Sequence, residues 1–324
     1  MCAIFGLLDF GFRLLHADRI KIIRALSVSA EVRGTDATGI AFVKDSAIGI
    51  QKAPRPAHRM KLRFPSEARF VMGHTRMTTQ GSELKNQNNH PFLAKTKSGQ
   101  FALAHNGVLY NDRELRRIHG LPHTKIETDS YVAAQLIEKS GQVAHKSLKS
   151  MAEKLEGSFT ITVLDSKNNL YFVKGNNPLT IYLLPELGCY VYASTKEILD
   201  EALEKIGLAA IPKVIVPINQ GDIMRIDSEG KRTVSRFDDS RITMRGYYSG
   251  FGRWCSPFYV TPPKEEDSYL EEVIDFGKRM GVPETELRLL VDFGFDALEL
   301  EELIYDDQYR GLCVREIMCD LGVC

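Results

Sequence analysis

The chain has 324 residues, of which 44% are hydrophobic and 26% charged, and this balance predicts a packed core rather than a disordered chain. Its 42 Lys and Arg residues equal its 42 Asp and Glu residues, which argues against broad electrostatic binding of nucleic acid or of an anionic membrane. The sequence has neither a signal-peptide pattern nor a run of about 18 apolar residues. None of its six cysteines forms a CxxC pair, so we expect reduced thiols in the cytoplasm and no metal site.

Short strands alternate with helices along the first 225 residues or so. A compact apolar run at 2–10 predicts a first strand. The segment 19–32 has helical spacing, with a predicted buried face formed by Ile20, Ile23, Leu26 and Val28. Thr128 is a candidate N-cap for a later helix. Further strands, helices and hairpins are predicted in order at 39–44, 70–77, 100–111, 128–140, 157–184, 189–194, 195–207 and 221–237.

Meanders of strands with helices set apart predict an α+β fold. The sequence lacks the GxGxxG and GxxxxGK[ST] patterns of nucleotide-binding loops. Its composition changes after residue 238. Residues 239–266 are aromatic, Gly- and Pro-containing and irregular, which predicts a linker or an extended arm. Residues 267–324 predict three or four short helices, with Gly281 and Gly294 as helix stops.

Cys2 directly follows the start methionine. Removal of Met1 would leave Cys2 with both a thiol and a free α-amine, whose pKa of about 7.7–8.0 suits it to accept the thiol proton. This is the N-terminal nucleophile arrangement, which needs no catalytic histidine, metal ion or organic cofactor. Most Met-Cys starts have no such role, so the dipeptide alone favours an ordinary buried cysteine of a first strand.

Polar loops further along the chain supply groups that together suit one substrate. Arg76 in GHTRMTTQG offers a bidentate partner for a carboxylate, and Asp129 offers a charge for an ammonium. Asn106 and Gly107 can donate a side-chain and a backbone N–H to a developing oxyanion. Singly, each has a structural explanation: a solvated arginine, an Asn-Gly hairpin turn or an aspartate at a helix N-terminus. With Cys2 as nucleophile, the set fits glutamine, an α-amino acid with an acyl group at the end of its side chain.

The same motifs carry a resemblance to a known family. After Cys2, the segments RGTDATGIAF, GHTRMTTQG, NNHPF, AHNGVLYN and ETDSYVAAQLI follow the order and approximate spacing of class II glutamine amidotransferase domains. The likeness is greatest to the glutaminase domain of glucosamine-6-phosphate synthase. Later segments, GSFTITVLD, VKGNNPLTI, YVYASTKEIL and INQGDIMRI, extend it over about residues 2–238. The resemblance implies a four-layer αββα sandwich of the N-terminal nucleophile (Ntn) hydrolases over residues 1–238, with a small C-terminal helical appendage.

The resemblance also implies a role for seven residues of the site. They are Cys2 as nucleophile and, through its amine, general base; Asn106 and Gly107 as the oxyanion hole; Arg76 and Thr79 for the glutamine α-carboxylate; Asp129 for the α-amine; and Arg33 to order the site around the cysteine. The implied reaction is thiolate attack on the side-chain amide, release of ammonia, a γ-glutamyl thioester and hydrolysis to glutamate.

The chain departs from the synthase branch of the family in two places. Met77 and Gln80 replace a tryptophan and a histidine of relatives, and that tryptophan helps to gate the passage of ammonia. The 86 residues that follow Asp238 are too few for the acceptor domains of relatives. We therefore expect a stand-alone amidotransferase subunit that reaches an acceptor synthase or target protein in trans through its C-terminal helices. Hydrolysis of another γ-glutamyl amide, or a catalytically idle glutamine-binding regulator, stays open as an alternative.

Overall fold

The structure is a computed structural model that describes residues 2–243, 266–293, 295, 297–305 and 307–320. The chain divides into two compact units, Met1–Phe251 and Gly252–Cys324, and each is described by itself. Among the described helices, none combines the length and the apolar character needed to cross a membrane.

Two antiparallel sheets form the centre of the first unit. The first sheet has the strand order β11 (Val214–Ile215), β9 (Thr180–Leu184), β10 (Cys189–Ala193), β1 (Ala3–Asp9), β4 (Phe70–Arg76), β2 (Ala37–Lys44) and β3 (Ala47–Ala53). The second has the order β13 (Arg232–Arg236), β12 (Asp222–Ile226), β8 (Leu170–Lys174), β7 (Gly157–Asp165), β6 (Gly99–Leu109) and β5 (Phe92–Thr96). Short 3₁₀ helices lie in the connections at Ala30–Arg33 (η1), Ala57–Arg59 (η2) and Asn86–Asn88 (η3).

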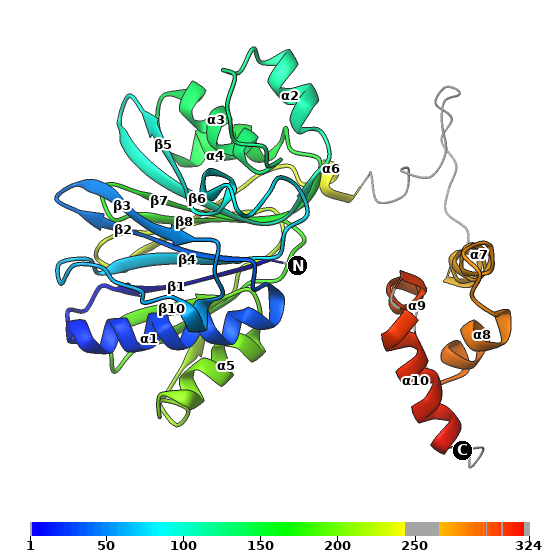
Figure 1. The fold of residues 1–324 in the computed structure, drawn as a ribbon. Coiled ribbons are helices and arrows are strands. Elements are labelled where there is room, and N and C mark those ends of the chain that lie inside the picture. Colours follow the sequence, from blue (N-terminus) through cyan, green and yellow to red (C-terminus); the bar gives the residue numbers. More distant parts are fainter. Residues whose placement is uncertain (1, 244–265, 294, 296, 306, 321–324) are drawn as a thin grey trace. The chain divides into compact units, whose positions relative to one another are not determined.

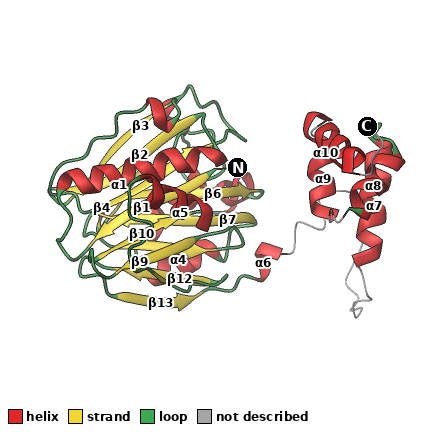
Figure 2. Cartoon of the chain, turned by 90° about the horizontal axis from the view of Figure 1, so that it is seen from below, coloured by secondary structure: helices red, strands yellow, loops and turns green. Residues whose placement is uncertain are grey.

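Helices cover the outer face of each sheet, which gives the four layers predicted from the sequence (Figure 1). Figure 2 shows α1 (His16–Ser29) and α5 (Lys196–Lys205) lying over the strands of the first sheet. The second sheet carries α3 (Tyr131–Ser140) and α4 (His145–Ala152), with α2 (Asp112–Ile118) beside α3. Buried apolar side chains fill each of the three spaces between the layers.

The central strand β1 is apolar up to Asp9, and both of its faces are covered. In β1, Phe5 and Leu7 belong to the cluster beneath α1 and α5, whereas Ile4 and Leu8 belong to the cluster between the sheets. Successive side chains of a strand point to opposite faces, so a strand buried on both sides has no polar alternation. The apolar run that predicted this strand therefore also places Cys2 at its N-terminal end.

The helix α1 buries two of the four predicted residues, Ile23 and Leu26, and Ile20 packs partly buried against the same apolar cluster. Arg19, Ile22, Ile23 and Leu26 point inward, while Ile20 and Val28 are only half-buried. Arg19 lies inside because its guanidinium donates to the buried Asp9 carboxylate at 2.7 Å. The spacing 19, 22, 23 and 26 is a regular helical face, but an apolar pattern does not include an arginine.

Two local predictions are also wrong. The strand β6 continues through Asn106 and Gly107 to Leu109 instead of turning there, because it stays paired with β7 over this segment, up to Leu109 opposite Gly157. The predicted N-cap, Thr128, precedes the helix by three residues, and α3 begins at Tyr131 after Ser130.

The C-terminal unit consists of four helices over the residues that are described: α7 (Glu266–Arg279), α8 (Glu284–Asp292), α9 (Ala297–Tyr305) and α10 (Asp307–Asp320). They enclose a small apolar cluster of their own that includes Ile274, Leu287, Leu290 and Leu300. Gly281 follows α7 with a positive φ of 92°, whereas the predicted stop at Gly294 lies outside the described residues. Most of the predicted linker lies outside them too, but a short helix, α6 (Ser240–Thr243), places Ile242 in the core of the first unit.

The balanced charge of the whole chain conceals two units of opposite charge. The first unit holds 35 Lys and Arg against 25 Asp and Glu, and the C-terminal unit holds 7 against 17. Their formal net charges are therefore +10 and −10. An argument from overall neutrality applies to neither unit taken by itself.

Candidate active site

The Cys2 thiol lies against the backbone that follows strand β4. Its Sγ is 3.4 Å from both Met77 N, which donates to it, and Met77 O, which accepts from it. Burial raises the pKa of this thiol above its usual value, although the Met77 N–H and the nearby Arg76 charge act in the opposite direction. The resting residue is therefore a protonated thiol near neutral pH, and it needs a base before it can attack.

Arg33 holds the backbone of the cysteine. It ends η1, and its Nε donates to Cys2 O at 3.0 Å. Burial lowers the pKa of Arg33, while the Cys2 thiolate would raise it. The residue expected to order the site is thus in direct contact with Cys2.

The RGTD loop also positions the loop that follows β4. A Cβ on Gly34 would lie 2.4 Å from the carbonyl carbon of Arg76, so the close approach of the two backbones requires glycine. Asp36 N donates to Arg76 O at 3.0 Å, and the Asp36 carboxylate accepts from Thr78 N at 2.7 Å. These contacts join the two motifs although about 40 residues separate them in the sequence.

Arg76 ends β4 and is almost fully buried. Its Nη1 donates to Asn89 Oδ1 at 2.6 Å, and its Nη2 donates to the carbonyls of Gln80 and Gly81 at 2.6 and 3.0 Å. A guanidinium has five N–H donors, so its bonds to the described residues leave the Nε–H and one Nη1–H, which lie on different edges of the group and can each donate a single hydrogen bond to a substrate. Thr79, in the same loop, is exposed and makes no hydrogen bond with the described residues.

Asn106 and Gly107 are consecutive residues of β6, which belongs to the second sheet. Asn106 is 1% exposed, and its Nδ2 donates one hydrogen bond, to Ser194 Oγ at 3.4 Å. Gly107 has a φ of 141°, and a Cβ there would lie 1.9 Å from Ser158 O, so no other residue fits without displacing the backbone. Asn177 Nδ2 donates to Asn106 O at 2.8 Å, which gives this part of the strand a second side-chain contact.

Asp129 lies immediately before α3 and contacts the end of β6. Its carboxylate accepts from Leu109 N at 2.6 Å and from Ser130 Oγ at 3.2 Å. Ser130 Oγ lies 2.7 Å from His105 Nδ1. The carboxylate is therefore held by the strand that carries Asn106 and Gly107, and its remaining lone pairs can accept from an ammonium.

Three buried histidines, His74, His90 and His105, lie close in the chain to Arg76, Asn89 and Asn106. Burial lowers the pKa of His74 to about 3 and lowers the pKa values of His90 and His105, so all three are neutral near pH 7. His74 Nε2 donates to His105 O at 3.0 Å across the two sheets, and the His74 and His90 rings lie 4.3 Å apart. In the part of the chain that the structure describes, no group of three or more His, Cys, Asp and Glu side chains is arranged to hold a metal ion.

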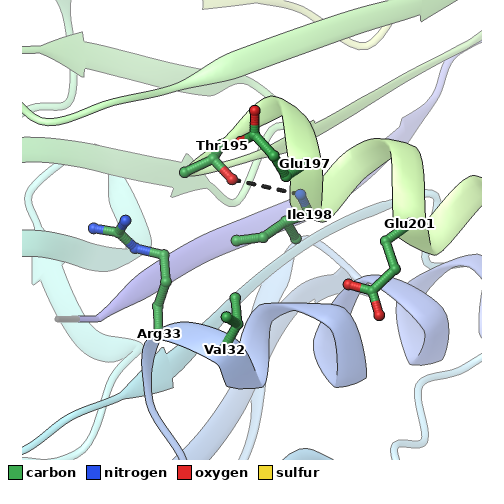
Figure 3. A pocket seen from close by; sticks show the side chains of 6 residues that line it. All are labelled: Val32, Arg33, Thr195, Glu197, Ile198 and Glu201. Atoms are coloured by element: carbon green, nitrogen blue, oxygen red, sulfur yellow. Dashed lines mark hydrogen bonds between the residues drawn. The ribbon is translucent and has the colours of Figure 1, made fainter. Parts of the chain in front are cut away.

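A pocket of about 400 Å³ lies on the outer side of Arg33, at the N-terminal end of α5 (Figure 3). Thr195 caps this helix by accepting from Ile198 N. The pocket is lined by Val32, Arg33, Thr195, Glu197, Ile198 and Glu201. Arg33 is its single residue in common with the predicted glutamine site.

The site contains contacts that the sequence did not identify. Asn89, Asn177 and Ser194 hold Arg76 and Asn106 in place, as described above. Their motifs, NNHPF, VKGNNPLTI and YVYASTKEIL, were visible as part of the resemblance. No spacing rule connects them to residues that lie between 13 and 88 positions away.

Comparisons with known proteins support the class that this fold and these residues define. Residues 74–201 match the family described as a glutamine amidotransferase domain. The glutamine–fructose-6-phosphate aminotransferase (isomerizing) of Sulfolobus acidocaldarius is 28% identical over 263 residues, which are 76% of this chain and 43% of that enzyme. The enzyme of the same name from Geobacillus kaustophilus is 30% identical over 191 residues, 56% of this chain and 30% of that enzyme.

Solved structures show the same fold. The glutamine phosphoribosylpyrophosphate amidotransferase of B. subtilis, complexed with ADP and GMP, matches with a TM-score of 0.58 and 21% identity, over 73% of this chain and 49% of that one. The structure of the allosteric regulatory enzyme of purine biosynthesis matches with a TM-score of 0.59, 22% identity and the same coverage.

The chain contains a class II glutamine amidotransferase domain with the Ntn-hydrolase sandwich, as the sequence motifs predicted. Its matched relatives of known function are enzymes of this class. The chain spans less than half the length of the curated relatives described above.

Proposed function

We propose that this chain hydrolyses the side-chain amide of glutamine with Cys2 as an N-terminal nucleophile. The observation that carries the proposal is the position of Cys2, whose thiol contacts the Met77 backbone and whose carbonyl accepts from Arg33, near the positive charge of Arg76. A buried, protonated thiol next to a carboxylate-binding arginine suits an acyl-transfer site for an amino acid.

In the proposed reaction, removal of Met1 first exposes the α-amine of Cys2. The amine takes the thiol proton, and the thiolate adds to the side-chain carbonyl carbon of glutamine. Asn106 Nδ2 and Gly107 N donate to the resulting oxyanion. When the tetrahedral intermediate collapses, the ammonium of Cys2 returns a proton to the leaving nitrogen. Ammonia departs and leaves a γ-glutamyl thioester.

Water completes the cycle by the same route in reverse. The α-amine takes a proton from water as its oxygen adds to the thioester carbonyl, and the same two N–H groups bind the second oxyanion. The C–S bond then breaks, the thiol regains its proton, and glutamate leaves. Arg76 and Thr79 bind the α-carboxylate throughout, and Asp129 binds the α-ammonium.

We further propose that the ammonia serves an acceptor on another protein, which binds through the C-terminal helices. Two features of that unit support an interaction surface: its net charge of −10 and the exposure of Met280, Phe293, Tyr305 and Leu312. Since Lys278, Arg288 and Arg310 already pair with carboxylates within the unit, the excess negative charge favours a partner with a basic surface. We place both proteins in the cytoplasm, where thiols stay reduced.

The decisive experiment follows Cys2 directly. The purified chain is incubated with glutamine, with asparagine and with a glutamine-analogue thiol alkylator, and its intact mass is recorded. We expect loss of Met1, one label at Cys2, and release of glutamate from glutamine alone. If Met1 is retained and no glutamate forms, the chain is an idle glutamine-binding regulator instead. If labelling occurs but a different γ-glutamyl amide is cleaved, the substrate assignment is wrong and the nucleophile is right.

The interaction surface is tested by reversing charge on the full chain. Glu272 and Asp292 are exposed and have no ion-pair partner among the described residues, so Glu272→Lys with Asp292→Lys should preserve glutaminase activity. We expect a partner protein to co-purify with the native chain and to raise its glutamine turnover. The same partner should not co-purify with this variant. If the partner binds the native chain and the variant equally well, the acidic surface is not the binding site.

A further inference from the structure

Ser194 joins the two strands that carry the reactive groups of the proposed site. It directly follows β10 and is completely buried. Its Oγ accepts from Ile4 N of β1 at 2.9 Å and from Asn106 Nδ2 of β6 at 3.4 Å. Its own backbone N donates to Ile4 O at 2.9 Å. One hydroxyl thus connects the strand that begins at Cys2 with the amide expected to bind the oxyanion.

The contact crosses the layer between the two sheets. β1 belongs to the first sheet and β6 to the second, and the space between them is filled mainly by apolar side chains. A second hydrogen bond, from His74 of β4 to His105 O, crosses the same layer one residue along β6. The segment of β6 at His105 and Asn106 is therefore fixed to the nucleophile-bearing sheet at two adjacent points.

The chemistry of the hydroxyl suits it to set an orientation. A serine oxygen has two acceptor positions, and here both are occupied, one by each strand. The Asn106 amide has two N–H donors, and its bond to Ser194 uses one, which leaves the other for the substrate. An amide held in this way cannot rotate its free N–H away from the reacting carbonyl without losing a buried hydrogen bond.

We propose that Ser194 is a positioning residue for the oxyanion hole, which sets the orientation of Asn106 relative to Cys2. The inference rests on the proposed glutaminase function. An oxyanion donor contributes mainly in the transition state, and Ser194 contacts none of the expected substrate-binding residues. Its loss should therefore lower kcat and leave the KM for glutamine nearly unchanged.

The test is a double-mutant cycle of Ser194→Ala and Asn106→Ala in the full chain, with turnover expressed per Cys2 titrated by the alkylator. Loss of an oxyanion donor slows turnover by about 100- to 1000-fold, and a misplacement of about 1 Å costs about 100-fold. Because Ser194→Ala keeps the donor and removes only what orients it, we expect kcat to fall by about 10- to 100-fold. In the Asn106→Ala background the same change should alter kcat less than about twofold, because Ser194 acts through Asn106. The control, Ser27→Ala, removes a buried hydroxyl that bonds only within α1 and should keep native turnover.

Circular dichroism shows whether each variant folds. If Ser194→Ala does not fold, Ser194→Cys takes its place in the cycle, because cysteine keeps the size of the side chain and is a weaker hydrogen-bond acceptor. The proposal is overturned if the folded variant keeps native kcat, or loses the same factor with and without Asn106. A native chain that releases no glutamate refutes the proposed function and this inference with it. If the native chain is active but the effects of Ser194→Ala and Asn106→Ala on kcat are independent, only this inference is refuted.

Discussion

Acid should destabilise the first unit through its buried histidines. An imidazole in an unfolded chain has a pKa of about 6.5, whereas burial lowers the pKa of His74 to about 3 and that of His90 well below its usual value. Between pH 7.5 and 5.5 the unfolded chain therefore gains nearly one proton at each residue, and the folded chain gains almost none. Because the unfolded state binds more protons, the free energy of unfolding decreases as the pH is lowered. Between pH 7.5 and 5.5 it decreases by about 1.4 kcal/mol for each imidazole.

His74 and His90 together should cost about 3 kcal/mol over this interval, which is a large part of the roughly 5–15 kcal/mol that stabilises a typical domain. His105, whose pKa burial also lowers, acts in the same direction. His90 is the residue to change. Neither of its ring nitrogens has a hydrogen-bond partner among the described residues, and its ring packs 4.3 Å from both His74 and Phe92. A leucine there keeps the apolar packing and removes one titrating group.

The assay is urea unfolding of the native chain and of His90→Leu at pH 7.5 and pH 5.5. The loss of stability between the two pH values should be smaller in the variant by about 1.4 kcal/mol. The matched control is His123→Gln, because His123 is exposed and its ring stays in water on folding. Each protein is compared with itself at the two pH values, so a change in packing that lowers its stability equally at both cancels, and the difference reports the titration of His90. If His90→Leu loses as much stability as the native chain, His90 is not the neutral buried imidazole described here.

Two further predictions concern the oxyanion donor and the core. Asn106→Ala should lower glutamine turnover by about 100- to 1000-fold, since it removes one donor to the oxyanion, and near-normal turnover in a steady-state assay would contradict the assignment. Asp9→Asn should cost about 3–5 kcal/mol of stability, because it leaves the buried Arg19 guanidinium without its charged partner. Urea unfolding measures this change, and a loss below about 1 kcal/mol would show that the pair is dispensable.

Most of the strands of the first unit could be predicted from the sequence. Strands such as Ala3–Asp9 are apolar on both faces, and helix α5 begins directly after the capping residue Thr195. The residue types of the site were also readable, since a nucleophile, a guanidinium, a carboxylate and an Asn-Gly pair occur in a recognisable order. Local patterns suffice for such features because they depend on neighbours a few positions away.

Several features of the site depended on contacts that local patterns do not contain. The Asn106-Gly107 pair is typical of a hairpin turn, yet the strand passes through it because β6 stays paired with β7 as far as Leu109. The inward face of α1 includes Arg19 because a carboxylate lies opposite it in the folded chain. Similarly, the separation of the chain into a basic and an acidic unit is visible only once its compact units are defined.

The sequence alone determined the class of the domain, the residue types of its site and Cys2 as the candidate nucleophile. The tertiary structure decided how these groups are held. Ser194 and Asn106 are 88 positions apart, and Cys2 and Met77 are 75 apart. The contact of Cys2 with Met77 exists only after β1 and β4 have paired in one sheet, and the bond between Ser194 and Asn106 exists only after the two sheets have packed face to face. Tertiary structure, and not the local chain, brings these partners within reach.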